Sequence, residues 1–375
     1  MRLLRLNAQN FRNVELVRLA LGGKSHFLLG RNGQGKTNFL EAAGLLGALR
    51  SFRTNDAGAL IRQGQPQARL FYEVERAGGL DCKVDLTLEP KGKTLQVDGE
   101  RIARLGDFLG RFPAVVLSSD DNQLLRGSPG ARRRFLDLHL SSLEPAYYEH
   151  LRRYHRALAA RNRLLKQSRA GNSQQSSAAL GSFEEAMAPE AAALARSRRR
   201  EVKVLETHFI RAYAAFAEAA EAPRVCLKLS LDTDQPDAFR DAWLANRERD
   251  LRLGSTSVGP HRDDLAFTVL GRSARAFGSE GQQRSFVIAL RLAQFARLKE
   301  ALGQTPLVLA DDVLGELDPR RRDRFWNALE GDPQVLATGT SLPVLPVERD
   351  WRLVEVASGV FTPREGPPSV DPIDA

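Results

Sequence analysis

The feature that most constrains this chain is a phosphate-binding loop near its N-terminus. The loop reads GRNGQGKT and fits the pattern G-x-x-x-x-G-K-[ST] without a mismatch. An apolar stretch at residues 27–29 precedes it, and residues 39–49 are rich in Ala and Leu at helical spacing. A strand, loop and helix in this order surround phosphate groups with backbone N–H groups and a helix N-terminus. We therefore expect ATP to be bound by Gly30, Arg31, Asn32, Gly33, Gln34, Gly35, Lys36 and Thr37.

Two side chains of this loop have specific expected roles. Lys36 should neutralise the β- and γ-phosphates, and Thr37 should offer its hydroxyl to Mg²⁺. The alternative interpretation is a glycine-rich turn that happens to be followed by Lys-Thr. The strand before the loop and the helix after it favour the ATP site with its Mg²⁺.

The acidic half of such a site lies far downstream. A P-loop needs a carboxylate for Mg²⁺ at the end of a neighbouring strand, and Asp311 follows the apolar run at residues 307–310 directly. Asp312 comes next and is expected to orient or deprotonate the attacking water. The alternative is that one of the two aspartates caps the strand end. We expect Lys36, Asp311 and Asp312 to be catalytic, and Thr37 with Asp311 to hold the metal ion.

Because most of the chain separates the two halves, a whole structural unit must be inserted between them. Residues 129–222 are rich in Ala, Leu, Arg and Glu, which is helical composition, and residues 167–182 read as a loop joining two long helices. Alternating segments after the first helix predict an antiparallel meander. The sequence thus predicts an α/β fold with a mixed sheet and a second, mainly helical lobe. The head lobe should comprise residues 1–117 and 255–375, and the helical lobe residues 118–254.

The order of the motifs narrows the class further. Ser279, Gly281 and Gln282 form a Ser-x-Gly-Gln run ahead of the strand and the two aspartates. This order is the one found in ABC-type ATPases, in which the signature of one subunit closes on the γ-phosphate held by the other. The alternative for the run is a helix capping box. Residues 315–318 (GELD), which end at Asp318, resemble the dimer-facing loop of that class. The alternative is a helix start, because Pro319 follows.

Several segments resemble one particular family within this class. The resemblance to the RecF family of SMC-like ABC-type ATPases spans nearly the whole chain. It rests on residues 6–13 (LNAQNFRN), 126–137 (RGSPGARRRFLD), 259–264 (GPHRDD), 279–284 (SEGQQR) and 311–318 (DDVLGELD).

The resemblance implies a function as well as a fold. It implies an ATPase head, with the helical lobe in place of a long coiled coil, and an ATP-dependent homodimer that clamps gapped or junction DNA. It also implies weak DNA-stimulated ATP hydrolysis, help in loading recombinase, and roles in DNA repair, replication and the SOS response. The implied partners are DNA and recombination mediators of the RecR and RecO type.

The chain departs from related ATPases at two points. Asp312 stands where transporter-type ATPases carry glutamate, so we expect slow hydrolysis. Gly315 stands where the family's usual serine lies in the loop after the aspartates, which puts a dimer contact there in doubt. For the glutamine that senses Mg²⁺, Gln123 is the one candidate we name.

The charge of the chain suits a polyanionic partner. The formal net charge is +9, and arginines gather in three clusters. Such side chains neutralise phosphates without reading sequence, so we expect structure-selective DNA binding. The alternative is that each cluster is a solvated helix face. The clusters are Arg132, Arg133 and Arg134; Arg196, Arg198, Arg199 and Arg200; and Arg320, Arg321 and Arg322, of which 132–134 and 198–200 are the candidate DNA contacts.

His261 lies beside Gly-Pro and Arg-Asp-Asp, and we interpret it as part of a structural turn rather than as a proton carrier. Asp263 and Asp264 are expected to pair with arginines rather than to do chemistry.

Other classes are less consistent with the sequence. Two cysteines without a CxxC pair argue against zinc or disulfide frameworks, and no apolar run has the length of a signal peptide or a membrane span, so we expect a cytoplasmic protein without a membrane partner. The subunit of a membrane importer would share the nucleotide chemistry, but the long insert and the absence of a switch histidine at Thr338–Thr340 oppose it. A small-molecule kinase would leave Ser279 and the Asp311 segment unexplained.

Overall fold

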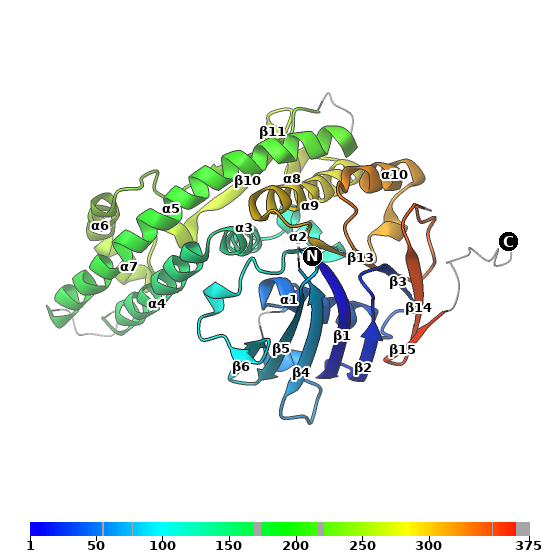
Figure 1. The fold of residues 1–375 in the computed structure, drawn as a ribbon. Helices are drawn as coiled ribbons and strands as arrows, with labels where there is room; N and C mark the ends of the chain where they lie inside the picture. Colours follow the sequence, from blue (N-terminus) through cyan, green and yellow to red (C-terminus); the bar gives the residue numbers. More distant parts are fainter. Residues whose placement is uncertain (55, 77, 169–173, 217–220, 347, 365–375) are drawn as a thin grey trace. The chain divides into compact units, whose positions relative to one another are not determined.

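In the computed structural model the chain forms two compact units (Figure 1). The first unit comprises residues 1–121, 211–218 and 287–375, and the second comprises residues 122–210 and 219–286. Residues 255–286, which the sequence-based division put with the head, pack with the second unit instead. The structure describes residues 1–54, 56–76, 78–168, 174–216, 221–346 and 348–364.

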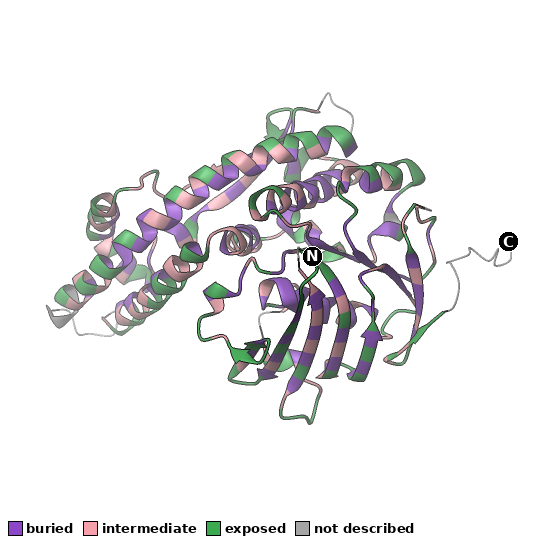
Figure 2. Cartoon of the chain, viewed as in Figure 1, coloured by how far each residue is buried: buried purple, intermediate pink, exposed green. Residues whose placement is uncertain are grey.

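One sheet of the first unit is parallel except at one edge. Its order is β15-β14-β3-β13-β12-β8, and only β15 runs antiparallel to its neighbour. Strands β12 and β13 are buried along their whole length, which agrees with the apolar runs at residues 307–310 and 335–337 (Figure 2). The strands are β3 (Ser25–Leu29), β8 (Ala114–Ser118), β12 (Leu307–Asp311), β13 (Val335–Gly339), β14 (Trp351–Ala357) and β15 (Val360–Pro363).

The second sheet of this unit is antiparallel, in the order β2-β1-β4-β5-β6-β7, and the predicted meander is confirmed. Its strands alternate between buried and exposed residues, because one face packs on the core (Figure 2). The strands are β1 (Arg2–Phe11), β2 (Val14–Ala20), β4 (Ala68–Glu75), β5 (Asp81–Glu89), β6 (Gly92–Val97) and β7 (Glu100–Arg101).

Helix α1 (Lys36–Ala48) packs against strands of both sheets, and its apolar residues join one core with them. The Tyr72 hydroxyl on β4 donates to the Ala42 carbonyl of α1 over 2.7 Å, deep in this core. The core therefore fixes the helix whose first turn carries the phosphate-binding residues. The unit also holds α10 (Pro319–Ala328) and the C-terminal part of α9 (Glu280–Leu302).

The second unit is mainly helical around a three-stranded sheet in the order β11-β10-β9. The predicted loop at residues 167–182 is too long. Helix α4 runs to Ser168 and α5 starts at Gln174, because the Gln, Ala and Leu residues at 174–180 favour a helix. The rest of the predicted loop, residues 169–173, lies outside the described residues. The elements are α2 (Asn122–Arg126), α3 (Pro129–Leu143), α4 (Pro145–Ser168), α5 (Gln174–Phe216), β9 (Arg224–Lys228), α6 (Pro236–Ala245), α7 (Arg247–Leu253), β10 (Asp264–Val269), β11 (Arg272–Ser273) and α8 (Ala274–Phe277).

The GPHRDD segment is a structural turn, as predicted for His261. The Nε2 of His261 donates to the Thr256 carbonyl over 3.0 Å, so Nδ1 of the neutral ring accepts from the Tyr154 hydroxyl at 2.7 Å. Burial lowers the pKa of His261 to about 4, and nearby Arg262 opposes protonation further. The neutral imidazole thus connects α4 to this turn.

No described helix combines the length and the apolar composition that crossing a bilayer requires.

The neutral state of His261 predicts a pH dependence of stability. The imidazole titrates near pH 6.5 in the unfolded chain and near pH 4 in the folded one, so the unfolded state binds more protons between these values. The free energy of unfolding should be highest above pH 6.5, fall as the pH drops towards 4, and lose up to about 3 kcal/mol through this residue. Urea denaturation of the natural chain and of His261→Gln from pH 4 to 8 measures this. A constant difference between the two curves would contradict it.

Candidate nucleotide-binding site

The predicted phosphate-binding loop joins β3 to α1 at the carboxyl end of the parallel sheet. Gly30 donates its N–H to the Gly339 carbonyl of β13, and a Cβ at Gly30 would lie 2.2 Å from the Val356 carbonyl oxygen of β14. Gly33 and Gly35 have φ values of 78° and 109°, which favour glycine. The glycines of the motif are therefore required by packing and by backbone conformation.

Lys36 spans this loop from its buried position at the start of α1. Its ammonium donates to the Gly30 carbonyl over 2.7 Å and to the Arg31 carbonyl over 3.1 Å. Arg31, Asn32 and Gly33 are exposed, so the outer side of the loop is open to a ligand. A positive charge and free backbone N–H groups fit the phosphates of a nucleotide.

Two sets of hydrogen bonds, which were not predicted from the sequence, fix the conformation of the loop. Gln34 accepts the Ser358 N–H on its side chain (2.6 Å) and the Gly359 N–H on its carbonyl (3.0 Å). Asn13 donates to the Gly33 carbonyl over 3.4 Å and accepts from the Asn38 side chain at 2.6 Å. The Asn of the FRN element thus supports the P-loop.

The structure brings together the two predicted magnesium ligands. The Thr37 hydroxyl donates to Asp311 Oδ1 over 2.9 Å, and the Thr338 hydroxyl donates to the same oxygen over 2.9 Å. Burial raises the pKa of Asp311, and these two hydrogen bonds oppose that rise. One carboxylate and one hydroxyl are hard oxygen donors, so the set fits Mg²⁺ completed by phosphate and water.

Asp312 follows β12 in a left-handed conformation, with φ 54°. Its N–H donates to the Thr338 hydroxyl over 3.0 Å, so Thr338 fixes both aspartates. A non-glycine residue held in this region is often part of a functional site. Thr338 lies near the end of β13, and its role follows from the pairing of β13 with β12, which the sequence alone does not show.

A buried carboxylate beside the loop was also missed. Glu41 on α1 is fully buried, and Arg12 holds it with two hydrogen bonds of 2.9 and 2.7 Å. Ser51 donates to it as well, and Arg53 contacts it at 3.4 Å while bonding Asn38 at 2.8 Å. Arg53 is among the charges that oppose the raised pKa of Asp311. These residues belong to three separate segments, so no contiguous pattern indicates that they share one carboxylate.

The Ser-x-Gly-Gln run starts α9 and forms the predicted capping box. The Ser279 N–H donates to Gln282 Oε1 over 2.8 Å, and the Gln282 N–H donates to Ser279 Oγ over 3.2 Å. Gly281 completes this first turn, and Ser279 is exposed. The box fixes a helix N-terminus that faces solvent and suits an anion.

The structure also places the other residues predicted around the site. Asp318 caps α10 by accepting the Arg321 N–H at 3.0 Å, so the predicted helix start is present, and the side chain remains exposed. Gly315 is exposed in the turn before it. Gln123 lies in α2 of the second unit, whereas Ser118 at the end of β8 pairs in register with Asp311.

Two of the predicted DNA contacts are wrong. Arg132 is buried and holds Asp264 with two bonds of 2.7 and 2.9 Å. Arg198 is 1% exposed and binds Asp137 at 2.7 Å and Asp263 at 2.8 Å. Their guanidinium groups pair with buried and partly buried carboxylates of the second unit and are not presented to solvent. The predicted pairing of both aspartates with arginines is confirmed.

The remaining arginines of the two clusters differ among themselves. Arg133 donates to the Asp263 carbonyl over 2.7 Å, Arg134 is partly exposed, and Arg200 is exposed beside Glu144. Arg199 binds Asp232 over 2.7 Å.

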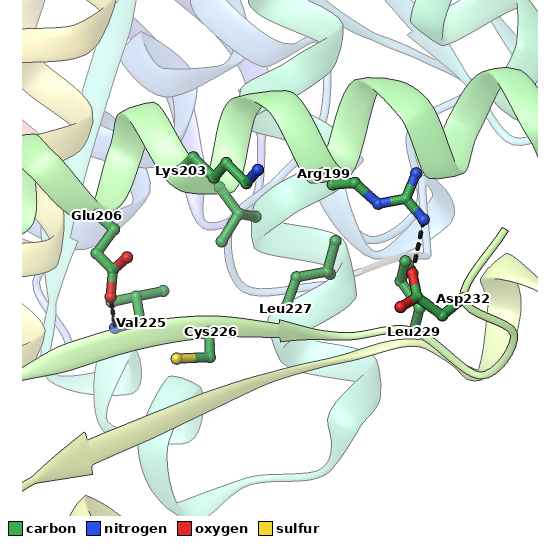
Figure 3. Close-up of a pocket in the computed structure, with 9 residues that line it drawn as sticks. Arg199, Lys203, Glu206, Val225, Cys226, Leu227, Leu229 and Asp232 are labelled. Carbon is green, nitrogen blue, oxygen red and sulfur yellow. Dashed lines mark hydrogen bonds and ion pairs between the residues drawn. The ribbon is translucent and has the colours of Figure 1, made fainter. Parts of the chain in front are cut away.

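Arg199 also lines a pocket of about 350 Å³ between α5 and β9. Figure 3 shows Arg199 and Lys203 on the helix side and Leu227 on the strand side, with Asp232 at one end. This pocket is built entirely from the second unit and shares no residue with the P-loop.

The fold and this site define an ABC-type P-loop ATPase head. Residues 2–342 match the family described as RecF/RecN/SMC N terminal domain. The DNA replication and repair protein RecF of Anaeromyxobacter sp. (strain K) is 38% identical over 380 residues, covering 97% of this chain and 99% of that protein. RecF of Geobacillus thermodenitrificans (strain NG80-2) is 33% identical over 344 residues, covering 90% and 92%. The chain belongs to the RecF family, and the resemblance in its motifs is confirmed.

Solved structures of related proteins have the same fold. The structure of the recombination mediator protein RecF-ATP in the RecFOR pathway superposes with a TM-score of 0.88 at 27% identity, covering 97% of both chains. An SmcHead structure bound to the C-winged helix domain of ScpA shares the fold, with a TM-score of 0.52 at 14% identity.

The Thr338 contact leads to a prediction about the metal. Thr338→Val removes a hydrogen bond from Asp311 and leaves the Asp312 N–H without its acceptor. Outer partners of a metal ligand are worth about 10–100-fold in metal affinity. The Mg²⁺ concentration that half-saturates binding of a fluorescent ATP analogue should therefore rise about tenfold or more. Thr340→Val, an exposed neighbour, should leave it unchanged. Equal Mg²⁺ requirements for both variants would exclude this role.

The buried arginines lead to a prediction about stability. Arg198→Ala leaves Asp263 and Asp137 without their cation, and breaking such a buried pair costs about 3–5 kcal/mol. Arg200→Ala removes an exposed pair and should cost at most about 1 kcal/mol. Chemical denaturation followed by circular dichroism compares the two. If both variants lose a similar free energy of unfolding, the buried ion pairs of Arg198 do not stabilise the second unit more than an exposed pair does.

Proposed function

We propose that this chain is an ATP-driven dimer clamp that acts on DNA in recombinational repair and replication maintenance. The observation that supports it most is that the phosphate-binding residues and the exposed Ser279 turn belong to different units. The P-loop and the Thr37–Asp311 pair are preformed in the first unit, whereas the capped and exposed Ser279 turn belongs to the second. In this proposal the Ser279 turn of one copy closes on the nucleotide of another. Family relatives named for DNA replication and repair support the setting.

The residues of the site suggest how ATP would be held. The backbone of Gly30–Thr37 would surround the phosphates, and Lys36 would leave the Gly30 and Arg31 carbonyls for the β- and γ-phosphates. Thr37 and Asp311 would hold Mg²⁺, which neutralises phosphate charge when bound.

Asp312 is our candidate for orienting the attacking water, and Lys36 and Asp311 complete the catalytic set. The side chain of Asp312 is one methylene shorter than a glutamate, and its backbone is held in a left-handed conformation by Thr338. We propose weak ATP hydrolysis that DNA stimulates, so that the ATP-bound dimer persists and hydrolysis opens it.

The DNA contacts we still propose are the accessible arginines: Arg133 and Arg134 in α3, and Arg199 and Arg200 in α5. With a net charge of +9, binding should be dominated by phosphates and have low sequence specificity. Partners of the RecR and RecO type, the dimer contact at Asp318 and a cytoplasmic location belong to the same proposal. The membrane-importer alternative has no support among the relatives.

The proposal predicts that nucleotide controls assembly. On a gapped duplex, ATP should shift the natural chain from monomer to DNA-bound dimer, and ADP should not. Lys36→Met should abolish the shift because phosphate neutralisation is lost. Asp312→Asn should still dimerise but hydrolyse ATP about 100-fold more slowly. Mass photometry and a phosphate-release assay measure both. DNA binding that ignores the nucleotide, or the absence of a dimer with ATP, would refute the clamp.

A further inference from the structure

An exposed apolar pair lies beside the Ser279 turn in the second unit. Leu270 is 64% exposed in the turn between β10 and β11, and Phe277 is 68% exposed at the end of α8, two residues before Ser279. The Arg272 guanidinium lies over the Phe277 ring, 5.7 Å from its centroid. Large apolar side chains gathered next to a motif, and rimmed by a cation, are typical of a surface that a protein covers.

Leu270 is also unfavourable in its backbone. Leu270 and Gly271 have φ values of 52° and 72°, as the two central residues of a type I′ hairpin turn do. Asn-Gly suits this turn, and a leucine there is strained. Leu270 thus has an unfavourable backbone conformation and an apolar side chain exposed to water. Such a combination indicates that the residue binds another molecule.

The pair is tied firmly to the Ser279 turn. The Glu221 carbonyl accepts the Leu270 N–H at 2.9 Å, and its carboxylate accepts from Gln282 Nε2 at 2.9 Å. Gln283 donates to the Gly278 carbonyl over 2.9 Å, which fixes the segment between Phe277 and Ser279. A surface that meets Ser279 therefore meets the two apolar side chains in a defined geometry.

We propose that Leu270 and Phe277 form an apolar contact surface for a second copy of this chain, covered when the Ser279 turn closes on that copy's nucleotide. The inference rests on the proposed function. The P-loop side of the molecule offers a counterpart: Val360 is 62% exposed and directly follows Gly359, whose N–H bonds to Gln34 of the P-loop. Apolar contact supplies stability that the Ser279 turn, which is polar, does not.

The test compares two double variants. Leu270→Asn with Phe277→Ser removes the apolar pair, and asparagine fits the left-handed turn, so the hairpin is retained. Leu244→Ser with Leu253→Ser removes two leucines of similar exposure, 57% and 55%, from α6 and α7. The dimer dissociation constant is measured by sedimentation with a non-hydrolysable ATP analogue. Affinity for the same analogue is measured at protein concentrations at which the chain is monomeric.

We expect the Leu270/Phe277 variant to raise the dimer dissociation constant about tenfold or more, with unchanged nucleotide affinity of the monomer. The Leu244/Leu253 variant should dimerise like the natural chain. If the natural chain dimerises and the Leu270/Phe277 variant does so equally well, the inference is wrong and the proposed function stands. If the natural chain does not dimerise with the analogue, both fail.

Discussion

The hydrogen bonds that Asp311 accepts from Thr37 and Thr338 are the interaction on which the site depends. They join residues from the P-loop helix and from the ends of β12 and β13, which are far apart in sequence but adjacent in the parallel sheet. The carboxylate is buried, so it requires donors to remain charged. The order of strands in the sheet is therefore what assembles the two halves of the motif into one site.

In the second unit, buried charged groups also have partners, and there they connect structural elements. Arg161 is fully buried and binds Glu184 and Asp250, each at 2.8 Å, and Arg198 binds Asp137 and Asp263. These ion pairs join helices to the turn at Pro260–Arg262 and to α7. Removal of one partner of such a pair leaves an uncompensated buried charge, so each pair constrains how these elements pack.

Features that depend on contiguous residues could be predicted from the sequence, whereas features that depend on residues far apart in the chain could not. The P-loop, the capping box and the strand before Asp311 are contiguous patterns, and their elements were predicted within a few residues. The arginine clusters were not, because the partners of Arg132 and Arg198, at positions 264 and 263, lie far along the chain, and charge alone does not separate a solvated arginine from a paired one. The boundary near residue 255 failed for a similar reason: strand β10 pairs with β9 of the inserted unit. The roles of Thr338, Asn13 and Glu41 depend on contacts with segments far away in the sequence, so they appear only in the folded structure.

The hydrogen bonds of Lys36 and Asp311 also bear on how nucleotide binding would act on the site. Lys36 donates to the loop carbonyls of Gly30 and Arg31, and Asp311 accepts from two hydroxyls, so both charged groups have hydrogen-bond partners. Phosphates and Mg²⁺ would replace these partners one for one, which makes nucleotide binding an exchange of interactions rather than a pure gain. Such an exchange yields a modest net free energy per site. In the proposed dimer, part of the free energy that holds two copies together would come from surfaces outside the P-loop, such as the exposed residues around Ser279.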